Sequence, residues 1–280
     1  MTQRSLALIL VLLFAHAAPV RAAGPRQILF LVDASASMGE TVLAPVESVG
    51  WWQRVVWRLY SVEHRDTPSA EAVAKIDIVR RGLERFVDQL PRGTVVGLRV
   101  FGQRRWLGCE DSERLLALAP LDGEQFRRTL ARVQPAPGGR TPLAFAVQEG
   151  ARDFLDRATG RNALIILTDA HPGCPSPLPA GDQLRRSMGI DLVIHVVGFA
   201  GAAARATELE RLTGPTGGLL VTVRDGAAVE LALKRAVPLT PAQEVAVALH
   251  LHPGARPAVV ITLLAVGLLL VVWWLVRSEK

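Results

Sequence analysis

The sequence predicts an α/β protein with a doubly wound, mostly parallel sheet of six strands. Short apolar runs alternate along the chain with longer stretches whose apolar residues recur at helical spacing. Several runs are continuously apolar, as expected for strands that helices cover on both faces. Two of these runs end in a carboxylate, Asp33 and Asp169. Open α/β sheets keep their sites at the carboxyl ends of parallel strands, so these two positions agree with the fold class.

Strands and helices are expected to alternate along the chain. The strands are residues 28–32, 94–101, 114–119, 162–167, 192–199 and 218–223, with 114–119 a short edge strand. The helices are residues 74–90, 124–133, 143–157, 203–213 and 225–236. Pro91 ends the first helix, and Pro142 suits the first turn of the third, which places Thr141 at its N-cap. This alternation predicts one domain over residues 24–237.

Both ends of the chain carry segments that are expected to lie outside this domain. Residues 1–23 contain Arg4, an apolar run and a cluster of small residues, the layout of a cleaved secretory signal peptide. Residues 258–276 hold no charged side chain. At about 1.5 Å per residue this segment spans roughly 28 Å, enough for a transmembrane helix. A buried core helix is the alternative.

The flanks of the apolar C-terminal segment predict its orientation. Residues 238–257 contain four prolines and predict a tether, and residues 277–280 form a short tail with Arg277 and Lys280. Positive residues favour the cytoplasmic side of a membrane. We therefore expect a single-pass protein of the inner or plasma membrane, with its globular domain periplasmic or extracellular.

Composition and cysteine spacing narrow the function. The formal charge is +6, but the arginines are scattered and no basic run with interleaved aromatics occurs, so nucleic-acid binding is not expected. The two cysteines, Cys109 and Cys174, lack the C-x-x-C spacing of thiol redox or zinc sites. In an oxidising compartment one disulfide is the simplest interpretation, and two free thiols are the alternative.

The loop after the first strand carries oxygen-bearing side chains at alternate positions, Asp33, Ser35 and Ser37. A buried strand has no internal use for a carboxylate, because burying an unpaired charge is costly. In an extended turn the three oxygens can face one point, and hydroxyl and carboxylate oxygens suit a hard cation such as Mg²⁺. An Asx-type turn that caps the next helix is the alternative.

Two further segments extend this pattern. Thr141 follows a glycine turn in the segment GRTPL, and Asp169 follows a buried strand in LTDA. A D-x-S-x-S loop, a distant threonine and a distant aspartate in this order resemble the metal-ion-dependent adhesion site (MIDAS) of the von Willebrand factor A (VWA) domain family. The resemblance covers about residues 26–236. Residues 98–102 (LRVFG), with the basic loop, cysteine and acidic residues that follow, are similar to a bacterial extracytoplasmic branch of the family.

The resemblance implies a Rossmann-like VWA fold and a bound divalent cation, Mg²⁺ or alternatively Mn²⁺ or Ca²⁺. Ser35, Ser37 and Thr141 would ligate the ion directly or nearly so, and Asp33 and Asp169 would act largely through water. One coordination position would stay open for an Asp or Glu carboxylate of a partner protein. Two carboxylates roughly balance the charge of a divalent ion, so an incoming acidic group can complete the shell.

Two features depart from the family pattern. Ala170 stands where the family usually has glycine, and residues 40–74 form a longer insertion than expected beside the metal loop. The insertion gathers aromatic side chains, which fit either a short helix packed on the domain or a partner-binding surface. These side chains are Trp51, Trp52, Trp57 and Tyr60.

The remaining candidate positions lie in or near the loops of the expected metal edge. A bond between Cys109 and Cys174 would brace these loops. His171, close to Asp169, is expected to be solvated, with metal or partner contact as the alternative. His195 lies within a predicted strand, where a satisfied core histidine is a simpler interpretation than a catalytic one.

The predicted function is a membrane-anchored module that binds a protein partner through a divalent ion. A structural subunit of an envelope complex without metal-dependent binding is one alternative. A hydrolase or phosphotransferase with Asp33 or Ser35 as nucleophile is another and is less favoured, because no G-x-S-x-G elbow or D-x-D signature occurs.

Overall fold

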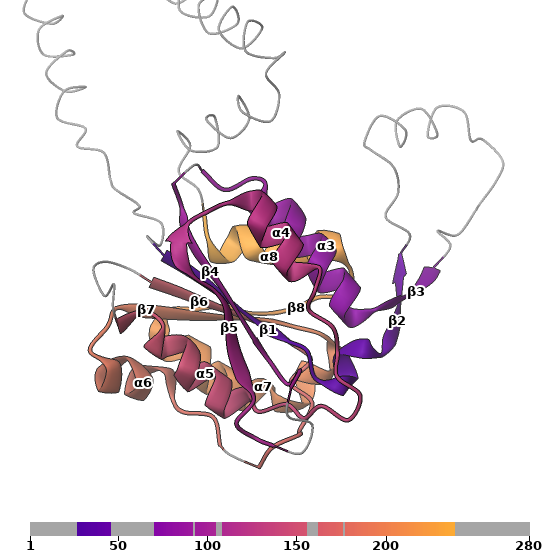
Figure 1. Ribbon diagram of the computed structural model, residues 1–280. Helices are drawn as coiled ribbons and strands as arrows, with labels where there is room; N and C mark the ends of the chain where they lie inside the picture. The colour runs from indigo at the N-terminus through magenta and orange to yellow at the C-terminus, as the bar shows by residue number, and fades with distance from the viewer. Residues whose placement is uncertain are drawn as a thin grey trace, which may run out of the picture.

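The computed structural model describes residues 27–45, 70–91, 93–104, 108–155, 162–175 and 177–238. A six-stranded sheet crosses this part of the chain in the order β5-β4-β1-β6-β7-β8 (Figure 1). The parallel strands are β1 (Gln27–Asp33), β4 (Val95–Phe101), β6 (Asn162–Thr168), β7 (Leu192–Gly198) and β8 (Leu220–Thr222). At one edge β5 (Ser112–Pro120) pairs antiparallel with β4. The predicted six-stranded, mostly parallel sheet is confirmed.

Helices cover both faces of the sheet (Figure 1). One face carries α3 (Lys75–Val87), α4 (Gly123–Leu130) and α8 (Gly226–Ala236), and the other carries α5 (Leu143–Arg152), α6 (Gly181–Met188) and α7 (Ala206–Thr213). Short 3₁₀ turns are η1 (Ala36–Gly39), η3 (Ala200–Arg205) and η4 (Gly214–Thr216). Each helical layer encloses its own hydrophobic cluster against the sheet, so the fold has three layers and two cores.

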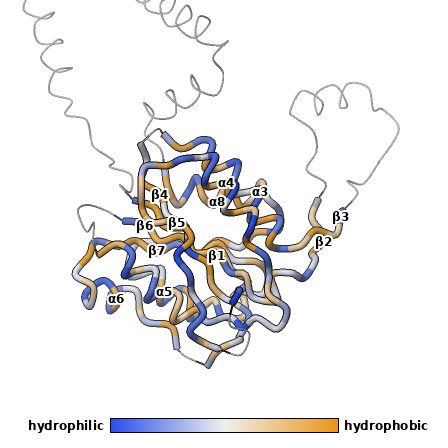
Figure 2. The backbone as a smooth tube through the Cα atoms, in the orientation of Figure 1, coloured by the Kyte–Doolittle hydropathy of each residue, from blue (hydrophilic) through white to orange (hydrophobic). Residues whose placement is uncertain are grey.

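Burial explains why the central strands read as continuous apolar runs. Every residue of β1, β6 and β7 is buried, whereas Leu118 is the one buried residue of the edge strand β5. Figure 2 shows hydrophobic colour along the central strands and an alternation of hydrophilic and hydrophobic colour along the helices. The helix α6 escapes the sequence analysis because only Gly181 and Leu184 of its eight residues are buried, too few to form a visible apolar stripe.

The segment 40–74 contains a paired arm at its two ends. β2 (Thr41–Pro45) and β3 (Ala70–Ala74) form an antiparallel two-stranded sheet that projects from the domain beside α3 (Figure 1). Residues 46–69, which hold the four predicted partner-binding aromatics Trp51, Trp52, Trp57 and Tyr60, lie outside the described residues. β2 has only five residues, too few for a clear alternation signal, which is why the sequence does not predict this arm.

The terminal segments also lie outside the described part of the chain. This holds for the predicted signal peptide (1–23), transmembrane helix (258–276) and tail (277–280), and for the tether (238–257) beyond its first residue. Among the described residues no helix is both long and apolar enough to cross a membrane.

The start of α5 differs from the prediction by one residue. Pro142, not Thr141, occupies the N-cap, because its backbone has φ −78° and ψ 53° and is not helical. α5 therefore begins at Leu143 and ends at Arg152, earlier than the predicted 157. Thr141 consequently lies in the loop before the helix rather than capping it.

The strand order places the candidate residues at a topological switch point. From β1 the chain moves outward on one side through β4 and β5, and then returns to β6 on the other side of β1. β1 and β6 are parallel neighbours with Val32 opposite Leu167, so Asp33 and Thr168 end side by side. Ligand sites of open α/β sheets lie at this point of the fold.

We predict a large loss of stability for Phe30→Ala. The Phe30 ring is fully buried and makes edge-to-face contacts with Phe86 and Phe126, at centroid distances of 6.2 and 5.8 Å. Its removal should lower the free energy of unfolding by about 3–5 kcal/mol, measured by urea denaturation. The control Leu231→Ala removes a half-exposed side chain and should cost under about 1 kcal/mol. Equal losses for the two variants would contradict this account of the core.

Candidate metal centre

The carboxylate of Asp33 is buried at the carboxyl end of β1 and fixed through both oxygens. Oδ1 accepts a hydrogen bond from the backbone N–H of Ser35 at 2.9 Å, and Oδ2 accepts one from Thr168 Oγ1 at 2.5 Å. The first bond forms an Asx-type turn, which the sequence analysis gave as the alternative to a metal-binding loop. No side-chain hydrogen bond caps η1, however, so the turn shapes the loop rather than serving as a helix cap.

Three more oxygen-bearing side chains meet beside Asp33. The hydroxyls of Ser35 and Ser37 are 3.2 Å apart, and Ser37 Oγ donates to Asp169 Oδ1 at 3.1 Å. Asp169 Oδ1 also accepts a bond from the backbone N–H of His171 at 3.1 Å. All three side chains are buried. The structure therefore joins four of the five predicted ligands in one hydrogen-bonded group.

Thr141 reaches the same edge through contacts between loops. The backbone N–H of Ala36 donates to Gly139 O at 3.1 Å, which fixes the turn before Thr141 against the loop after β1. On its other side Thr141 packs against Gly173, where an added Cβ would lie 2.4 Å from Thr141 N and 3.2 Å from Oγ1. Glycine at 173 thus permits the close approach that buries Thr141 at this edge.

The donors that contact the Asp33 carboxyl in the described part of the chain, the Ser35 N–H and the Thr168 hydroxyl, are neutral. Burial, followed by repulsion from Asp169, raises its pKa from 3.8 to about 7, although hydrogen bonds from Ser35 and Thr168 act in the opposite direction. The nearby carboxylate of Asp169 thus disfavours the charged form of Asp33. A cation at this position would relieve the repulsion.

The ammonium group of Lys75 contacts the second carboxylate, that of Asp169. Lys75, the first residue of α3, places its Nζ 2.7 Å from Asp169 Oδ2 and 2.8 Å from Glu40 Oε2. Burial alone would lower the pKa of Lys75, but the hydrogen bonds to Asp169 and Glu40 outweigh it and the net shift is upward. The ammonium is therefore charged and bound to a predicted metal ligand.

The sequence analysis missed Lys75, Glu40 and Thr168. One signal for Lys75 is present in the sequence, since the chain has only three lysines and this one begins an amphipathic helix. A cation at a helix N-terminus opposes the helix dipole, which suggests a function elsewhere. Thr168 offers no such signal, because a threonine at the end of a buried strand is ordinary.

The disulfide is confirmed. Cys109, in the loop between β4 and β5, is bonded to Cys174, in the loop after β6, with an S–S distance of 2.10 Å. Cys174 directly follows Gly173, the residue that packs against Thr141. The bridge consequently ties two loops of the metal edge together and supports the position of Thr141.

Ala170 shows why glycine is usual at its position. Its φ is +51°, in the left-handed region, and it is the only non-glycine residue with positive φ in the described part of the chain. This conformation costs an L-residue about 1 kcal/mol relative to glycine. The methyl group is fully buried, and the N–H donates to Thr168 Oγ1 at 2.8 Å, so packing and hydrogen bonding offset the strain.

The two histidines differ in their surroundings. His195 in β7 is buried, and its Nδ1 accepts a hydrogen bond from the backbone N–H of Leu219 at 3.2 Å, which agrees with a core role. His171 is exposed beside Asp169, and its backbone N–H rather than its ring contacts that carboxylate. A ring contact to a metal or partner stays a prediction.

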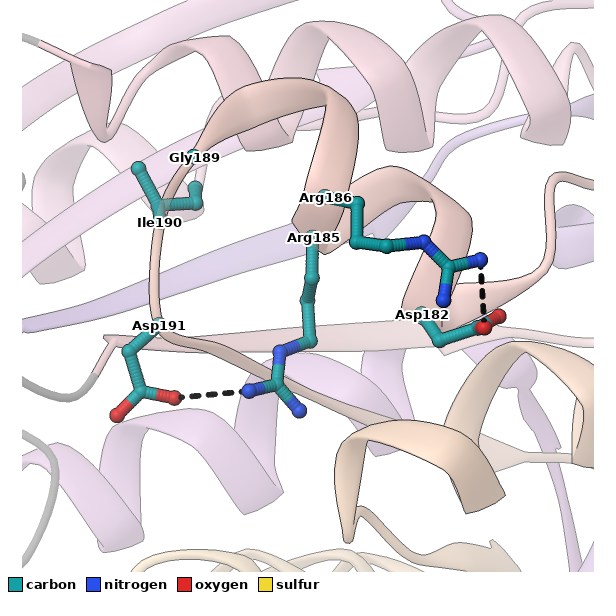
Figure 3. A pocket seen from close by; sticks show the side chains of 6 residues that line it. All are labelled: Asp182, Arg185, Arg186, Gly189, Ile190 and Asp191. Carbon is teal, nitrogen blue, oxygen red and sulfur yellow. Dashed lines mark hydrogen bonds and ion pairs between the residues drawn. The ribbon is translucent and has the colours of Figure 1, made fainter.

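A shallow surface pocket lies elsewhere on the molecule (Figure 3). It has a volume of about 420 Å³ and is lined by Asp182, Arg185, Arg186, Gly189, Ile190 and Asp191. Its arginines pair with carboxylates of the same segment, Arg185 with Asp191 at 3.5 Å and Arg186 with Asp182 at 2.8 Å. The pocket is at the amino end of β7, opposite the edge that carries Asp33 and Asp169. It takes no part in the candidate centre.

The donor set of the candidate centre fits a hard divalent cation. Its atoms are hydroxyl and carboxylate oxygens, the ligands of Mg²⁺, Mn²⁺ and Ca²⁺, without the thiolate or imidazole donors that zinc prefers. Within the described residues no three His, Cys, Asp or Glu side chains gather as metal ligands. A metal at this edge would accordingly depend on Ser35, Ser37 and Thr141.

A profile of the von Willebrand factor type A domain matches residues 69–235. The match covers more than half of the chain, which therefore belongs to the von Willebrand factor type A domain family. Members of this family often mediate metal-dependent protein interactions and are generally not enzymes. The matched range begins after the D-x-S-x-S loop, but β1, which carries that loop, lies at the centre of the same sheet.

Two relatives come from Bacillus subtilis (strain 168). Uncharacterized protein YwmD is 29% identical over 133 residues, which are 45% of this chain and 58% of the relative. Uncharacterized protein YwmC is 26% identical over 139 residues, 46% of this chain and 59% of the relative. The chain thus matches less than two thirds of either relative's length.

A solved structure shows the same fold. The von Willebrand factor type A protein from Catenulispora acidiphila has a TM-score of 0.51 and 15% identity, over 76% of this chain and 42% of that chain. At this identity the likeness concerns the fold alone.

We predict that Asp33 makes the metal-free protein less stable as pH rises. Its pKa is about 7 in the fold against 3.8 ordinarily, so between these values the folded protein keeps a proton that the unfolded chain has lost. The free energy of unfolding should fall by about 3 kcal/mol from pH 4 to pH 7 on this account. Asp33→Asn does not titrate and should lack this decline, measured by urea denaturation in EDTA.

The exposed Asp182→Asn supplies the control for this comparison, and its stability should follow the wild type at every pH. Parallel stability curves for Asp33→Asn and the wild type would contradict the raised pKa.

We also predict that loss of the disulfide destabilises the fold. The bridge closes a loop with a sequence separation of 65 residues. The double variant with Cys109→Ser and Cys174→Ser should lose about 2–4 kcal/mol in urea denaturation. Dithiothreitol should destabilise the wild type by a similar amount and leave the double variant unchanged. A wild type indifferent to the reductant would contradict a structural role of the bridge.

Proposed function

We propose that this chain is a metal-dependent protein-binding module, with a divalent cation held by Ser35, Ser37 and Thr141 and supported by Asp33 and Asp169. The cation is Mg²⁺, or alternatively Mn²⁺ or Ca²⁺. When bound, the ion supplies a Lewis-acidic position at the protein surface, where an Asp or Glu of a partner protein completes its coordination.

One observation carries this proposal. Ser35, Ser37 and Asp169 form a chain of contacts of 3.1 to 3.2 Å at the switch point of the sheet, with the unneutralised carboxyl of Asp33 beside them. Packing alone gives no reason to bury four polar side chains here, two of them carboxyls, because burying polar groups and charges costs free energy that apolar side chains would not. A cation site accounts for all of them together.

The proposal extends to the location of the protein. The predicted signal peptide (1–23) and transmembrane helix (258–276) support a single-pass membrane protein whose domain faces the periplasm or the exterior. The disulfide between Cys109 and Cys174 agrees with an oxidising compartment on that side. Trp51, Trp52, Trp57, Tyr60 and His171 are the proposed additional partner contacts.

A structural subunit without metal-dependent binding is the second candidate, and one observation favours it. The ammonium of Lys75 is already bound to Asp169 and neutralises one of the two carboxylates without any metal. Under this candidate the site would be a buried ion-pair network that holds loops in place. Metal binding therefore separates the two functions directly.

The proposal predicts saturable Mg²⁺ and Mn²⁺ binding that depends on the five predicted ligands. Isothermal calorimetry on the full chain should show binding weakened at least about tenfold by Asp33→Ala or by Thr141→Ala, because each removes a ligand oxygen or its charge. The controls Asp182→Ala and Ser187→Ala remove a carboxylate and a hydroxyl elsewhere and should bind as the wild type does.

Partner recognition has a separate readout. Immobilised chain should retain peptides that contain aspartate or glutamate in Mg²⁺ and release them in EDTA, and Asp33→Ala should not retain them. Wild-type protein that stays folded but binds neither metal nor acidic peptide would overturn the proposal in favour of the structural subunit.

A further inference from the structure

We infer that Lys75 is a built-in cation that competes with the divalent metal for Asp169, and that Glu40 receives its ammonium when the metal binds. The inference rests on the proposed metal function of this edge. It adds a residue that determines how tightly the site binds metal and how strongly it requires an anionic partner.

The geometry gives Lys75 two carboxylate partners in different surroundings. Its Nζ is 2.7 Å from Asp169 Oδ2, which is almost wholly buried, and 2.8 Å from Glu40 Oε2, whose side chain is 66% exposed. The backbone holds this arrangement, because the N–H of Lys75 donates to Glu40 O at 3.1 Å where the β2–β3 arm joins the domain. The ammonium therefore has a second partner close at hand, toward solvent.

The two oxygens of Asp169 face different groups. Oδ1 accepts bonds from Ser37 Oγ and from the N–H of His171, so it belongs to the proposed ligand cluster. Oδ2 is bound by Lys75. The Lys75 ammonium and a bound metal ion would compete for the carboxylate of Asp169. Two cations beside one carboxylate repel each other, so the ammonium weakens metal binding.

Charge arithmetic gives the consequence for the site. Asp33 and Asp169 together carry at most two negative charges, which a divalent ion alone would balance. Lys75 adds an excess of one positive charge to the metal-loaded site, and the Glu40 carboxylate, which is 66% exposed and more strongly screened by solvent, offsets this excess only in part. This excess weakens binding of the bare ion and strengthens binding of an ion together with a partner carboxylate.

A positioning role for Lys75 makes the opposite prediction. If the ammonium only orients Asp169 for the metal, its removal should weaken metal binding. If it competes with the metal, its removal should strengthen binding. The sign of the change therefore decides between the two roles.

The test measures Mn²⁺ binding to the full chain by the electron paramagnetic resonance signal of free Mn²⁺, beside the metal-dependent shift in thermal unfolding. Lys75→Met should bind Mn²⁺ about tenfold or more tightly, even if solvent screens the charge as strongly as in bulk water. It should also show a larger shift in melting temperature on adding metal, because a ligand that binds only the folded state stabilises it in proportion to its affinity.

Matched variants isolate the charge and guard against misfolding. Lys75→Arg keeps the charge and should bind Mn²⁺ as the wild type does, and Lys75→Gln keeps an N–H donor without the charge and should bind more tightly. Lys234→Met makes the same change in net charge at a surface ion pair with Glu230 and should have no effect. Glu40→Gln should weaken Mn²⁺ binding several-fold in the wild type and have a smaller effect in Lys75→Met, where no ammonium needs a second partner.

The outcomes distinguish failure of this inference from failure of the proposed function. Tighter binding by Lys75→Met and Lys75→Gln supports the inference, including the case in which the wild type binds no detectable Mn²⁺. Wild-type binding that Lys75→Met leaves unchanged or weakens overturns the inference and leaves the metal function standing. No binding by the wild type or by any folded Lys75 variant overturns both.

Discussion

Two carboxyl groups buried side by side are the constraint on which this site depends. Asp33 and Asp169 follow neighbouring parallel strands, and the switch in strand order leaves no other element between them. Their repulsion must be compensated, and the fold does so with hydrogen bonds from Ser35 and Thr168 to Asp33 and with an ion pair from Lys75 to Asp169. The loops around the site hold these hydrogen-bond donors and the Lys75 ammonium in place.

The two carboxyl groups are compensated unequally by their neighbours. Asp169 has a full positive charge beside it, whereas Asp33 has only neutral donors and a pKa raised to about 7 by burial and by its neighbour. A cation bound beside Asp33 would therefore stabilise the ionised form of this carboxyl group and would itself be held by the attraction. The disulfide between Cys109 and Cys174 and the close packing of Gly173 on Thr141 hold the remaining oxygen donors at the same edge.

Much of the fold could be predicted from the sequence because the central strands are buried on both faces, which leaves apolar runs such as residues 162–167 easy to find. The helix α6 could not, since too few of its residues are buried to give a period. The metal edge could be predicted as a set because carboxylates after apolar runs are unusual, and because the order of Asp33, Ser35, Ser37, Thr141 and Asp169 resembles the VWA family motif. Lys75 and Glu40 could not, because the ion pairs of Lys75 with Asp169 and with Glu40 depend on where the β2–β3 arm joins α3. Nothing local in the sequence specifies that arrangement.

The most direct test of this account is the anomalous diffraction signal of crystals of the chain grown in Mn²⁺. The account predicts a peak among the oxygens of Ser35, Ser37 and Thr141, with the Lys75 ammonium displaced from Asp169 toward Glu40. Saturating Mn²⁺ that gives no peak there, with Lys75 still bound to Asp169, would contradict it. The edge would then be a structural ion-pair network rather than a metal centre.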